Sequence, residues 1–223
     1  MKVVEIFNSI DGEGKRAGQL VTFIRLKGCN LNCPYCDTKY SWDSDQTEPM
    51  TMSPADLVDW VQDKGYPRVT LTGGEPLWGS IDQRGEVRLL LKELTNYGCE
   101  VNVETNGSID IEPFRVADPD RLFFTVDYKC PSSCMEDKMH LEMFKELKAE
   151  DVLKFVVGDV HDLDVAKLVT RLIDPQCAVY VSPVFGKIEP SEIVEYMQKY
   201  KMNQWRIQLQ LHKFIWDPNK RGV

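Results

Sequence analysis

Three cysteines lie close together in the segment CNLNCPYCDTKYSW, which runs from residue 29 to residue 42. Cys29, Cys33 and Cys36 have the spacing C-x3-C-x2-C, and no fourth cysteine stands near them in the sequence. Cysteine thiolates bind zinc or iron–sulfur clusters, and a four-iron cluster held by three thiolates keeps one iron free for an outside ligand. The spacing therefore indicates a metal centre with an open, reactive coordination position.

A structural zinc site is the alternative that the spacing leaves open. It would need a distant fourth ligand, such as Cys130, Cys134 or His140. Without that role, Cys130 and Cys134 are interpreted as incidental thiols, and Cys99 and Cys177 as small buried hydrophobic residues.

The composition limits the class of protein. The chain has 223 residues, with 27 basic and 35 acidic side chains and a formal charge of -8. This length allows one substantial core, so we expect a single domain over residues 1–223. The negative charge disfavours nucleic-acid binding, and no apolar run approaches the roughly 18 residues of a membrane span. With an odd number of cysteines and no export signal, we expect a cytoplasmic protein with reduced thiols and a small-molecule or protein partner.

Helix-like and strand-like segments alternate from residue 53 onward. Ser53 and Pro54 are expected to begin the first helix, and Gly65 to end it. Further helices are predicted at 86–97, 136–148, 161–173 and 190–201, and strands at 21–27, 68–72, 100–104, 122–126, 152–157, 178–181 and 206–211. This alternation predicts an α/β fold with a mostly parallel sheet, either doubly wound or an incomplete TIM-like (βα) barrel.

Polar residues gather where these predicted strands end. They are Thr72, Gly73, Gly74, Glu75, Glu104, Thr105, Asn106, Asp127, Lys129, Ser182, Gln210 and His212. In parallel α/β folds the carboxyl ends of the strands form the rim where ligands bind. The cysteine loop follows the strand at 21–27, so we expect it on the same rim.

Charged residues within strands have two interpretations each. Arg25 lies in an apolar strand, where it pairs with Glu13 or faces an anionic ligand. Lys154 lies at a solvated edge or lines the barrel. Glu104 and His212 are either ordinary hydrogen-bonded residues at strand ends or part of a site.

The cysteine loop, followed one strand later by Thr72-Gly73-Gly74-Glu75-Pro76, resembles the radical S-adenosylmethionine superfamily. The resemblance implies a 4Fe-4S cluster on the three cysteines, with S-adenosyl-L-methionine on the free iron and a 5′-deoxyadenosyl radical as its product. Lacking Cβ atoms, the glycines would let the cofactor's amino group come close. The residues implied to bind the cofactor are Tyr35, Cys36, Asp37, Gly73, Gly74, Glu75 and Lys129, and the family's Ser-Pro-Lys segment is matched only at Lys129.

Three further stretches resemble the family of 7-carboxy-7-deazaguanine synthases. They are IFNSIDGEG at 6–14, CDT at 36–38, and the tail with LHKFIW at 211–216 and NKRGV at 219–223. The resemblance implies radical-mediated ring contraction of 6-carboxy-5,6,7,8-tetrahydropterin to 7-carboxy-7-deazaguanine, with release of ammonia, on the route to 7-deazapurines such as queuosine. A glycyl-radical activating enzyme is an alternative, but it has no need of these stretches. A non-catalytic iron–sulfur module has no use for Gly-Gly-Glu-Pro.

The same resemblance implies substrate and metal ligands. The pterin would be bordered by Ile10, Asp11, Gly12, Glu13, Arg25, Thr72, Glu104, His212 and the terminal carboxylate of Val223. Many relatives carry glutamine where this chain has Asp11. Thr38 would offer its hydroxyl to a Mg²⁺ ion, although a turn or helix cap is the alternative for Asp37-Thr38. An electron donor such as flavodoxin and a homodimer are also implied.

Overall fold

One sheet forms the centre of the protein in the computed structural model, which describes residues 1–43 and 46–223. The described strands are β1 (Lys2–Ile10), β2 (Leu20–Leu26), β3 (Met50–Thr51), β4 (Arg68–Gly73), β5 (Glu100–Thr105), β6 (Leu122–Tyr128), β7 (Val152–Val157), β8 (Ala178–Pro183) and β9 (Trp205–Ile207). Their order is β3-β1-β2-β4-β5-β6-β7-β8-β9. Neighbours from β2 to β9 are parallel, and β1 is antiparallel to β2 and β3. Since β3 and β9 are its two edges, the predicted incomplete barrel of mostly parallel strands is confirmed.

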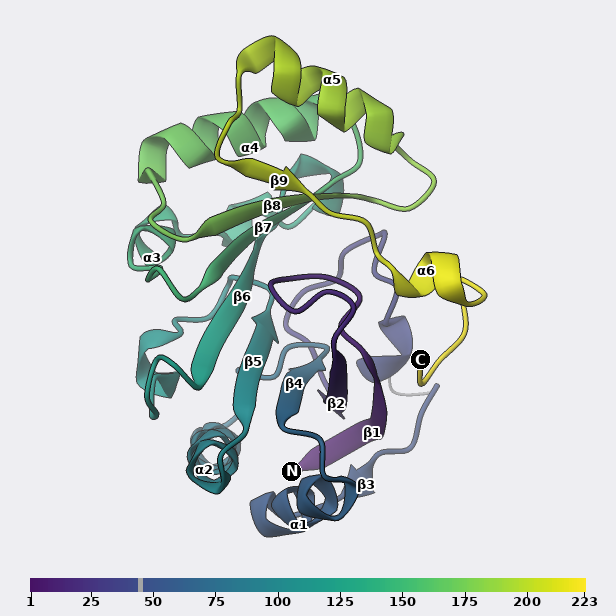
Figure 1. The fold of residues 1–223 in the computed structure, drawn as a ribbon, viewed down its shortest axis with the longest axis vertical. Helices are drawn as coiled ribbons and strands as arrows, with labels where there is room; N and C mark the ends of the chain where they lie inside the picture. The colour runs from purple at the N-terminus through teal and green to yellow at the C-terminus, as the bar shows by residue number, and fades with distance from the viewer. Residues whose placement is uncertain (44–45) are drawn as a thin grey trace.

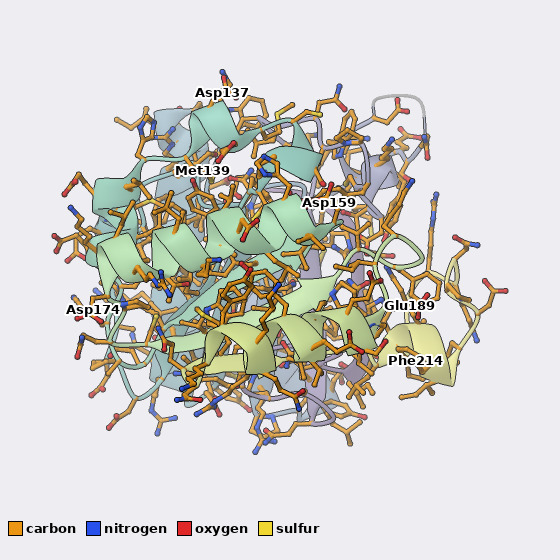
Figure 2. The ribbon with its side chains drawn as sticks, turned by 90° about the horizontal axis from the view of Figure 1, so that it is seen from above. Asp137, Met139, Asp159, Asp174, Glu189 and Phe214 are labelled. Atoms are coloured by element: carbon orange, nitrogen blue, oxygen red, sulfur yellow. The ribbon has the colours of Figure 1, made fainter. Side chains whose placement is uncertain are left out.

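Helices cover the outer side of this curved sheet (Figure 1). The described helices are α1 (Pro54–Lys64), α2 (Ile81–Tyr97), α3 (Leu141–Lys145), α4 (Val160–Ile173), α5 (Pro190–Tyr200) and α6 (His212–Ile215), with 3-10 turns at Lys39–Ser41, Glu112–Phe114, Pro131–Ser133 and Glu136–Lys138. Figure 2 shows α4 and α5 side by side, with the residues that precede them, Asp159 and Glu189, on the side where Phe214 of α6 lies. These helices therefore begin at the rim that α6 also borders. None of the described helices is long and apolar enough to cross a membrane.

The strands separate apolar from polar side chains by simple alternation. On β4 and β5, the apolar residues Val69, Leu71, Val101 and Val103 belong to the core, and the polar residues between them point to the other face. Together with the matching positions on β6, β7 and β8, these polar residues are Thr70, Thr72, Asn102, Glu104, Thr125, Asp127, Lys154 and Ser182. The outer face thus packs against helices, and the inner face is a polar surface suited to a ligand.

The segment from residue 11 to residue 19, between β1 and β2, lies against this inner face and connects distant strands (purple in Figure 1). Gly14 N donates to Gln208 Oε1 at 2.7 Å, and Gln208 Nε2 donates to Gly14 O at 3.0 Å, just beyond β9. On the other side, Arg16 donates to the carbonyls of Val69 at 3.0 Å and Glu100 at 2.9 Å. The segment therefore bridges both halves of a barrel whose strands do not close.

Several predicted boundaries need correction. The helix expected at 136–148 is wrong, because extended backbone at Met139 and His140 separates a 3-10 turn from the short helix α3. The strand expected at 206–211 ends at Ile207, because the side chain of Gln208 turns inward to the backbone of Gly14. Helix α2 begins at Ile81 rather than residue 86, after a capping box. The strands β1 and β3 were not predicted.

Helix α1 follows its sequence signals closely. The Ser53 hydroxyl accepts from Asp56 N, Pro54 is the first helical residue, and Gly65 ends the helix with φ of 71°. Cys99 and Cys177 are buried, as predicted, and so is Cys130, whereas Cys134 is exposed.

Candidate active site

The cysteine loop leaves the carboxyl end of β2 and is fixed by backbone contacts to the next strand. Gly28 N donates to Ser41 O at 2.9 Å, and Glu75 N donates to Gly28 O at 2.8 Å. The register pairs Leu26 of β2 with Gly73 of β4, so the loop starts beside the Gly-Gly-Glu-Pro turn. The two motifs therefore lie side by side on one rim.

Within residues 1–43 and 46–223, two of the three cysteine sulfurs receive hydrogen bonds. Cys29 Sγ accepts from Leu31 N at 3.4 Å and from Asn106 Nδ2 at 3.7 Å. Cys36 Sγ accepts from Trp42 Nε1 at 3.5 Å. Such donors stabilise thiolate charge and influence the potential of an iron–sulfur cluster.

The glycines after β4 allow close packing of backbone on backbone. A Cβ at Gly74 would lie 2.2 Å from the carbonyl oxygen of Gly28, and one at Gly73 would lie 2.4 Å from the carbonyl oxygen of Leu26. Gly73 also has φ of +154°, which few side chains tolerate. These glycines therefore let the end of β4 pack directly on the backbone that leads into the cysteine loop, a role that was not predicted from the sequence.

Glu75 is fixed by the loop that follows β5. Its carboxylate accepts from Asn106 N at 2.6 Å, Thr105 Oγ1 at 2.8 Å and Leu77 N at 3.0 Å. Burial raises its pKa to about 7, and the donated hydrogen bonds oppose that rise. Glu75 therefore connects the Gly-Gly-Glu-Pro turn to Asn106, which in turn reaches Cys29.

A network of charges lies deeper on the inner face. Lys154 Nζ lies 2.9 Å from Glu13 Oε2 and 3.8 Å from Asp127 Oδ1. The other oxygen of Glu13 accepts from the Ser182 hydroxyl at 2.7 Å. Burial alone would lower the pKa of Lys154, but Asp127 and Glu13 raise it, so the ammonium stays charged. Lys154 thus lines the barrel, which decides between its two interpretations.

Lys129 connects this network to the cysteine loop, since the charged groups that act on it include Asp127 and, from the loop, Tyr35 and Cys33. Lys129 Nζ lies 2.8 Å from Asp127 Oδ2. Burial opposes the charge on Lys129, but Asp127 raises the pKa of its ammonium. The Tyr35 hydroxyl is buried and has no hydrogen-bond partner in the described residues. An unpartnered hydroxyl at this place fits a bound polar cofactor, because buried polar groups are rarely left unpaired.

Arg25 and Glu104 border Thr72 on the same inner face. Arg25 stands opposite Thr72 in the β2–β4 register, and the Thr72 side chain lowers the pKa of Glu104 on the neighbouring strand β5. Burial raises the pKa of Glu104 to about 7, against the opposing charge of Lys154. A carboxyl group with this pKa can exchange a proton near neutral pH.

The partner of Arg25 differs from the predicted one. Arg25 Nε bonds to Glu5 Oε1 at 2.7 Å, whereas Glu13 pairs with Lys154. In the part of the chain that the structure describes, Arg25 donates its one side-chain hydrogen bond from Nε, and none involves its two terminal nitrogens. That end of the guanidinium is therefore left for an anionic ligand.

Asp37 and Thr38 follow the third cysteine and lie in a turn, as the alternative for this pair expects, although the Thr38 side chain does not cap the 3-10 turn that follows. Thr38 precedes the 3-10 turn at Lys39–Ser41 without a side-chain cap, and its hydroxyl lies 3.6 Å from Cys36 Sγ. The half-exposed carboxylate of Asp37 lies 3.2 Å from Lys213 Nζ. Burial opposes ionisation of Asp37, but Lys213 lowers its pKa.

The stretch at 6–14 and the C-terminal tail meet at Gly12. Leu211 N donates to Gly12 O at 3.1 Å, and a Cβ at Gly12 would lie 2.5 Å from His212 Nδ1. Ile10 ends β1 beside this contact, and Val223 is partly exposed at the end of the tail.

Asp11 is directed away from the rim. Its carboxylate lies 2.8 Å from Arg16 Nε and accepts from Thr70 Oγ1 at 2.8 Å. Burial raises the pKa of Asp11, while Arg16 acts in the opposite direction. The side chain thus anchors the 11–19 segment, and the place of Asp11 beside the pterin stays a prediction.

One residue of this site, Glu5, was not considered from the sequence, and two others, Lys154 and Asn106, were considered there without the partners that the structure gives them. Glu5 and Lys154 contact predicted residues directly, and Asn106 joins Glu75 to Cys29. Lys154 had a usable signal, since a lysine in the apolar run Val152–Val157 must find a partner. Glu5 had none, because its strand was not predicted.

Comparisons with known proteins identify the family. The family model for the Radical SAM superfamily matches residues 23–156. The 7-carboxy-7-deazaguanine synthase of Clostridium acetobutylicum is 45% identical over 224 aligned positions, covering 100% of this chain and 99% of that protein. This chain belongs to the 7-carboxy-7-deazaguanine synthase family.

Further relatives support that membership of the family. The 7-carboxy-7-deazaguanine synthase of Methanospirillum hungatei is 36% identical, covering 96% of this chain and 85% of that protein. The crystal structure of QueE from Escherichia coli has a TM-score of 0.69 at 23% identity, covering 93% and 92% of the two chains. That likeness supports the fold.

Family membership also decides between the two metal centres. As a member of the radical SAM superfamily, the protein uses a 4Fe-4S cluster and S-adenosylmethionine, which rules out the zinc alternative for the loop. Within residues 1–43 and 46–223, no three His, Cys, Asp or Glu side chains are grouped as ligands of a single metal ion. The loop with three cysteines, the donors to sulfur and the unpartnered Tyr35 hydroxyl fit the cluster and its cofactor.

Proposed function

We propose that this protein converts 6-carboxy-5,6,7,8-tetrahydropterin to 7-carboxy-7-deazaguanine with release of ammonia, in 7-deazapurine biosynthesis. The observation that carries the proposal is the row of Arg25, Thr72 and Glu104 across three neighbouring strands beside the cysteine loop. It offers a cation for the pterin carboxylate and a carboxyl group that exchanges a proton near neutral pH. Cys29, Cys33 and Cys36 would hold the cluster.

When bound, the cluster and S-adenosylmethionine supply a carbon-centred radical that removes a hydrogen atom from the substrate. The protein's own residues then position the reactants and exclude water. Tyr35, Asp37, Gly74 and Lys129 would border the cofactor, of which Lys129 offers a charged donor and Tyr35 a free hydroxyl. Glu75 and Gly73 would contribute to cofactor binding by fixing the conformation of the Gly-Gly-Glu-Pro turn.

The substrate would lie between the inner face and the 11–19 segment. Glu13, held by Lys154 and Ser182, presents a fixed carboxylate to the amino groups of the pterin. Gly12 and His212 would close one side, with Ile10, the backbone of Asp11 and the terminal carboxylate of Val223 nearby.

We also propose that the Thr38 hydroxyl binds Mg²⁺ together with the substrate carboxylate and water. A hard cation that stays partly hydrated needs few protein oxygens. Thr38→Ala should retain the cluster but lose most of the stimulation by magnesium, whereas Thr38→Ser keeps the hydroxyl and should keep the stimulation. Activity measured against magnesium concentration tests this role, and an unchanged dependence in Thr38→Ala would refute it.

The remaining parts of the proposal concern the whole protein. Residues 1–223 would act as one radical enzyme domain in the cytoplasm, where thiols stay reduced. The protein would form a homodimer and take electrons from a donor such as flavodoxin.

A product assay tests the reaction. Anaerobically reconstituted protein is given reductant, S-adenosylmethionine, Mg²⁺ and the carboxytetrahydropterin, and the products are separated by liquid chromatography with mass detection. We expect 7-carboxy-7-deazaguanine and ammonia in equal amounts. Cofactor cleavage without any deazapurine would overturn the substrate assignment and would favour the activating-enzyme alternative.

A further inference from the structure

Glu5 connects two residues near the proposed substrate site. Its Oε1 atom receives both Arg25 Nε at 2.7 Å and the Tyr40 hydroxyl at 2.8 Å. The three side chains come from β1, from β2 and from the turn after the cysteine loop. Glu5 and Arg25 are 19% and 13% exposed, so this contact is largely shielded from water. A shielded, charge-assisted contact of this kind restrains the orientation of a guanidinium group.

The ring of Tyr40 carries a second arginine. The Arg221 guanidinium lies 3.8 Å from the ring centroid, and that of Arg25 lies 6.0 Å from it. An arginine over a tyrosine face is attracted by the ring quadrupole, more strongly where water is excluded. Tyr40 itself is 8% exposed, so its ring is a fixed platform.

Arg221 lies in the tail after α6. The other contacts between side chains described for the tail come from α6 itself. Lys213 lies 3.2 Å from Asp37, and the ring of Phe214 packs against that of Phe185 at 6.4 Å between centroids. Among the described residues that follow α6, no side chain forms an ion pair. Arg221 instead contacts the ring of Tyr40. In Figure 1 the tail beyond α6 returns toward β1.

We propose that Glu5, Tyr40 and Arg221 form a positioning clamp that aims the free end of Arg25 at the pterin carboxylate and fastens the tail at 216–223 beside it. Glu5 engages Nε and so leaves the two terminal nitrogens of Arg25 as a fork that fits a carboxylate. Tyr40 joins the two functions, because its hydroxyl contacts Glu5 and its ring contacts Arg221. This inference rests on the proposed function for the identity of the bound anion.

Two substitutions at Tyr40 separate the two functions. Tyr40→Phe removes the hydroxyl and keeps the ring, so Glu5 loses one of its two partners and should hold Arg25 less firmly, while the tail stays fastened. Tyr40→Leu removes both. Neither variant alters the tail sequence, so hydrogen exchange of residues 216–223 can be compared directly between them by mass spectrometry.

The tail is tested from its own side by Arg221→Ala. We expect exchange at 216–223 to be several-fold faster in Arg221→Ala and in Tyr40→Leu, and unchanged in Tyr40→Phe. Arg221→Lys keeps a cation for the ring and should restore much of the protection. The matched control is Arg206→Ala, which removes another arginine–tyrosine contact, with Tyr180 at 5.8 Å, away from this site.

Steady-state kinetics test whether the clamp orients Arg25 toward the pterin carboxylate. In Tyr40→Phe we expect about a tenfold rise in KM for the pterin with an unchanged KM for S-adenosylmethionine, the pattern of lost substrate binding. Iron content per chain checks that every variant is folded. If Tyr40→Leu does not fold, Arg221→Ala still tests the fastening of the tail and Tyr40→Phe still tests the orientation of Arg25.

Three results would overturn parts of this scheme in distinguishable ways. Unchanged exchange in Arg221→Ala would overturn the fastening of the tail. An unchanged pterin KM in Tyr40→Phe would overturn the aiming of Arg25. Wild-type protein that makes no deazapurine would overturn the proposed function, while the exchange comparison, which needs no turnover, would still report on the clamp.

Discussion

Lys154 shows how one residue can organise a charged site. Glu13, Asp127 and Glu104 all interact with its ammonium, which lies on the inner face at β7. Without a cation at this place, three carboxylates would face one another in a shielded space, where like charges repel strongly. Lys154 therefore orients Glu13 and opposes the rise that burial causes in the pKa of Glu104.

We expect Lys154→Met to raise KM for the pterin by about tenfold or more, because Glu13 loses the partner that orients it. Lys154→Arg keeps the charge and should restore part of the affinity. Steady-state kinetics with each substrate varied in turn measures the effect. Lys145→Met, which removes an exposed ion pair on α3, is the control, and a loss of the same size there would contradict a local role for Lys154.

Glu75 gives the protein a pH-dependent stability. Its pKa in the fold is about 7, above the usual 4.5. The folded protein therefore binds more protons than the unfolded chain between these values, and the free energy of unfolding should fall as the pH rises through that window.

Urea unfolding of the metal-free, reduced protein at several pH values tests this slope. Glu75→Gln should make the slope shallower, although Glu104, with a similar pKa, preserves part of it. Glu142→Gln, on the exposed side of α3, should behave like the wild type. A slope in Glu75→Gln as steep as in the wild type would show that Glu75 is not its source.

At the scale of elements, the end of β4 determines how the cysteine loop is held. Gly74 packs on the carbonyl of Gly28 so closely that no side chain fits between them. Glu75 then ties the same turn to Asn106 and hence to Cys29. Strand end, turn and loop are thus joined by direct contacts.

Gly74→Ala should displace the start of the cysteine loop and lower the iron content and the visible absorbance of the reconstituted cluster several-fold. Its control is Gly85→Ala, because a Cβ at Gly85 meets nothing within 4 Å. In a helix that change should stabilise by about 1 kcal/mol and leave iron content unchanged. Full iron content in Gly74→Ala would show that the close packing is dispensable.

For the whole molecule, the 11–19 segment substitutes for barrel closure. Arg16 and Asp11, with side chains 3% and 2% exposed, form an ion pair on the inner side. Arg16 also reaches the backbone of β4 and β5, and Gly14 reaches the residue after β9. The open sheet is thereby held together through its interior.

Arg16→Met should lower the free energy of unfolding by roughly 3–5 kcal/mol, because it leaves a buried carboxylate without its partner. The double variant Arg16→Met with Asp11→Leu removes both charges and should recover part of the loss. Urea denaturation of the metal-free protein measures both values. If the double variant were as unstable as the single one, the uncompensated charge would not be the cause.

Short-range sequence signals explain which helices and strands could be predicted. Short-range signals such as the Ser53 cap, Gly65 and the period-two pattern of β5 depend on neighbouring residues, and they predicted α1 and the parallel strands. The pair of Lys154 and Glu13 joins residues 141 positions apart, and no local pattern identifies such partners. For the same reason Glu5 and its contact with Arg25 remained out of reach.

The sequence by itself indicated a metal centre at the cysteine loop, because three thiolates at fixed spacing lie within one loop, and family membership decided that this centre is an iron–sulfur cluster rather than zinc. The sequence also determined the class of fold, since the alternation of elements is local. Only the tertiary structure decided which charges meet inside the barrel and how the tail reaches Tyr40. Those contacts depend on the curvature of the sheet and the path of the 11–19 segment, which are properties of the packed molecule.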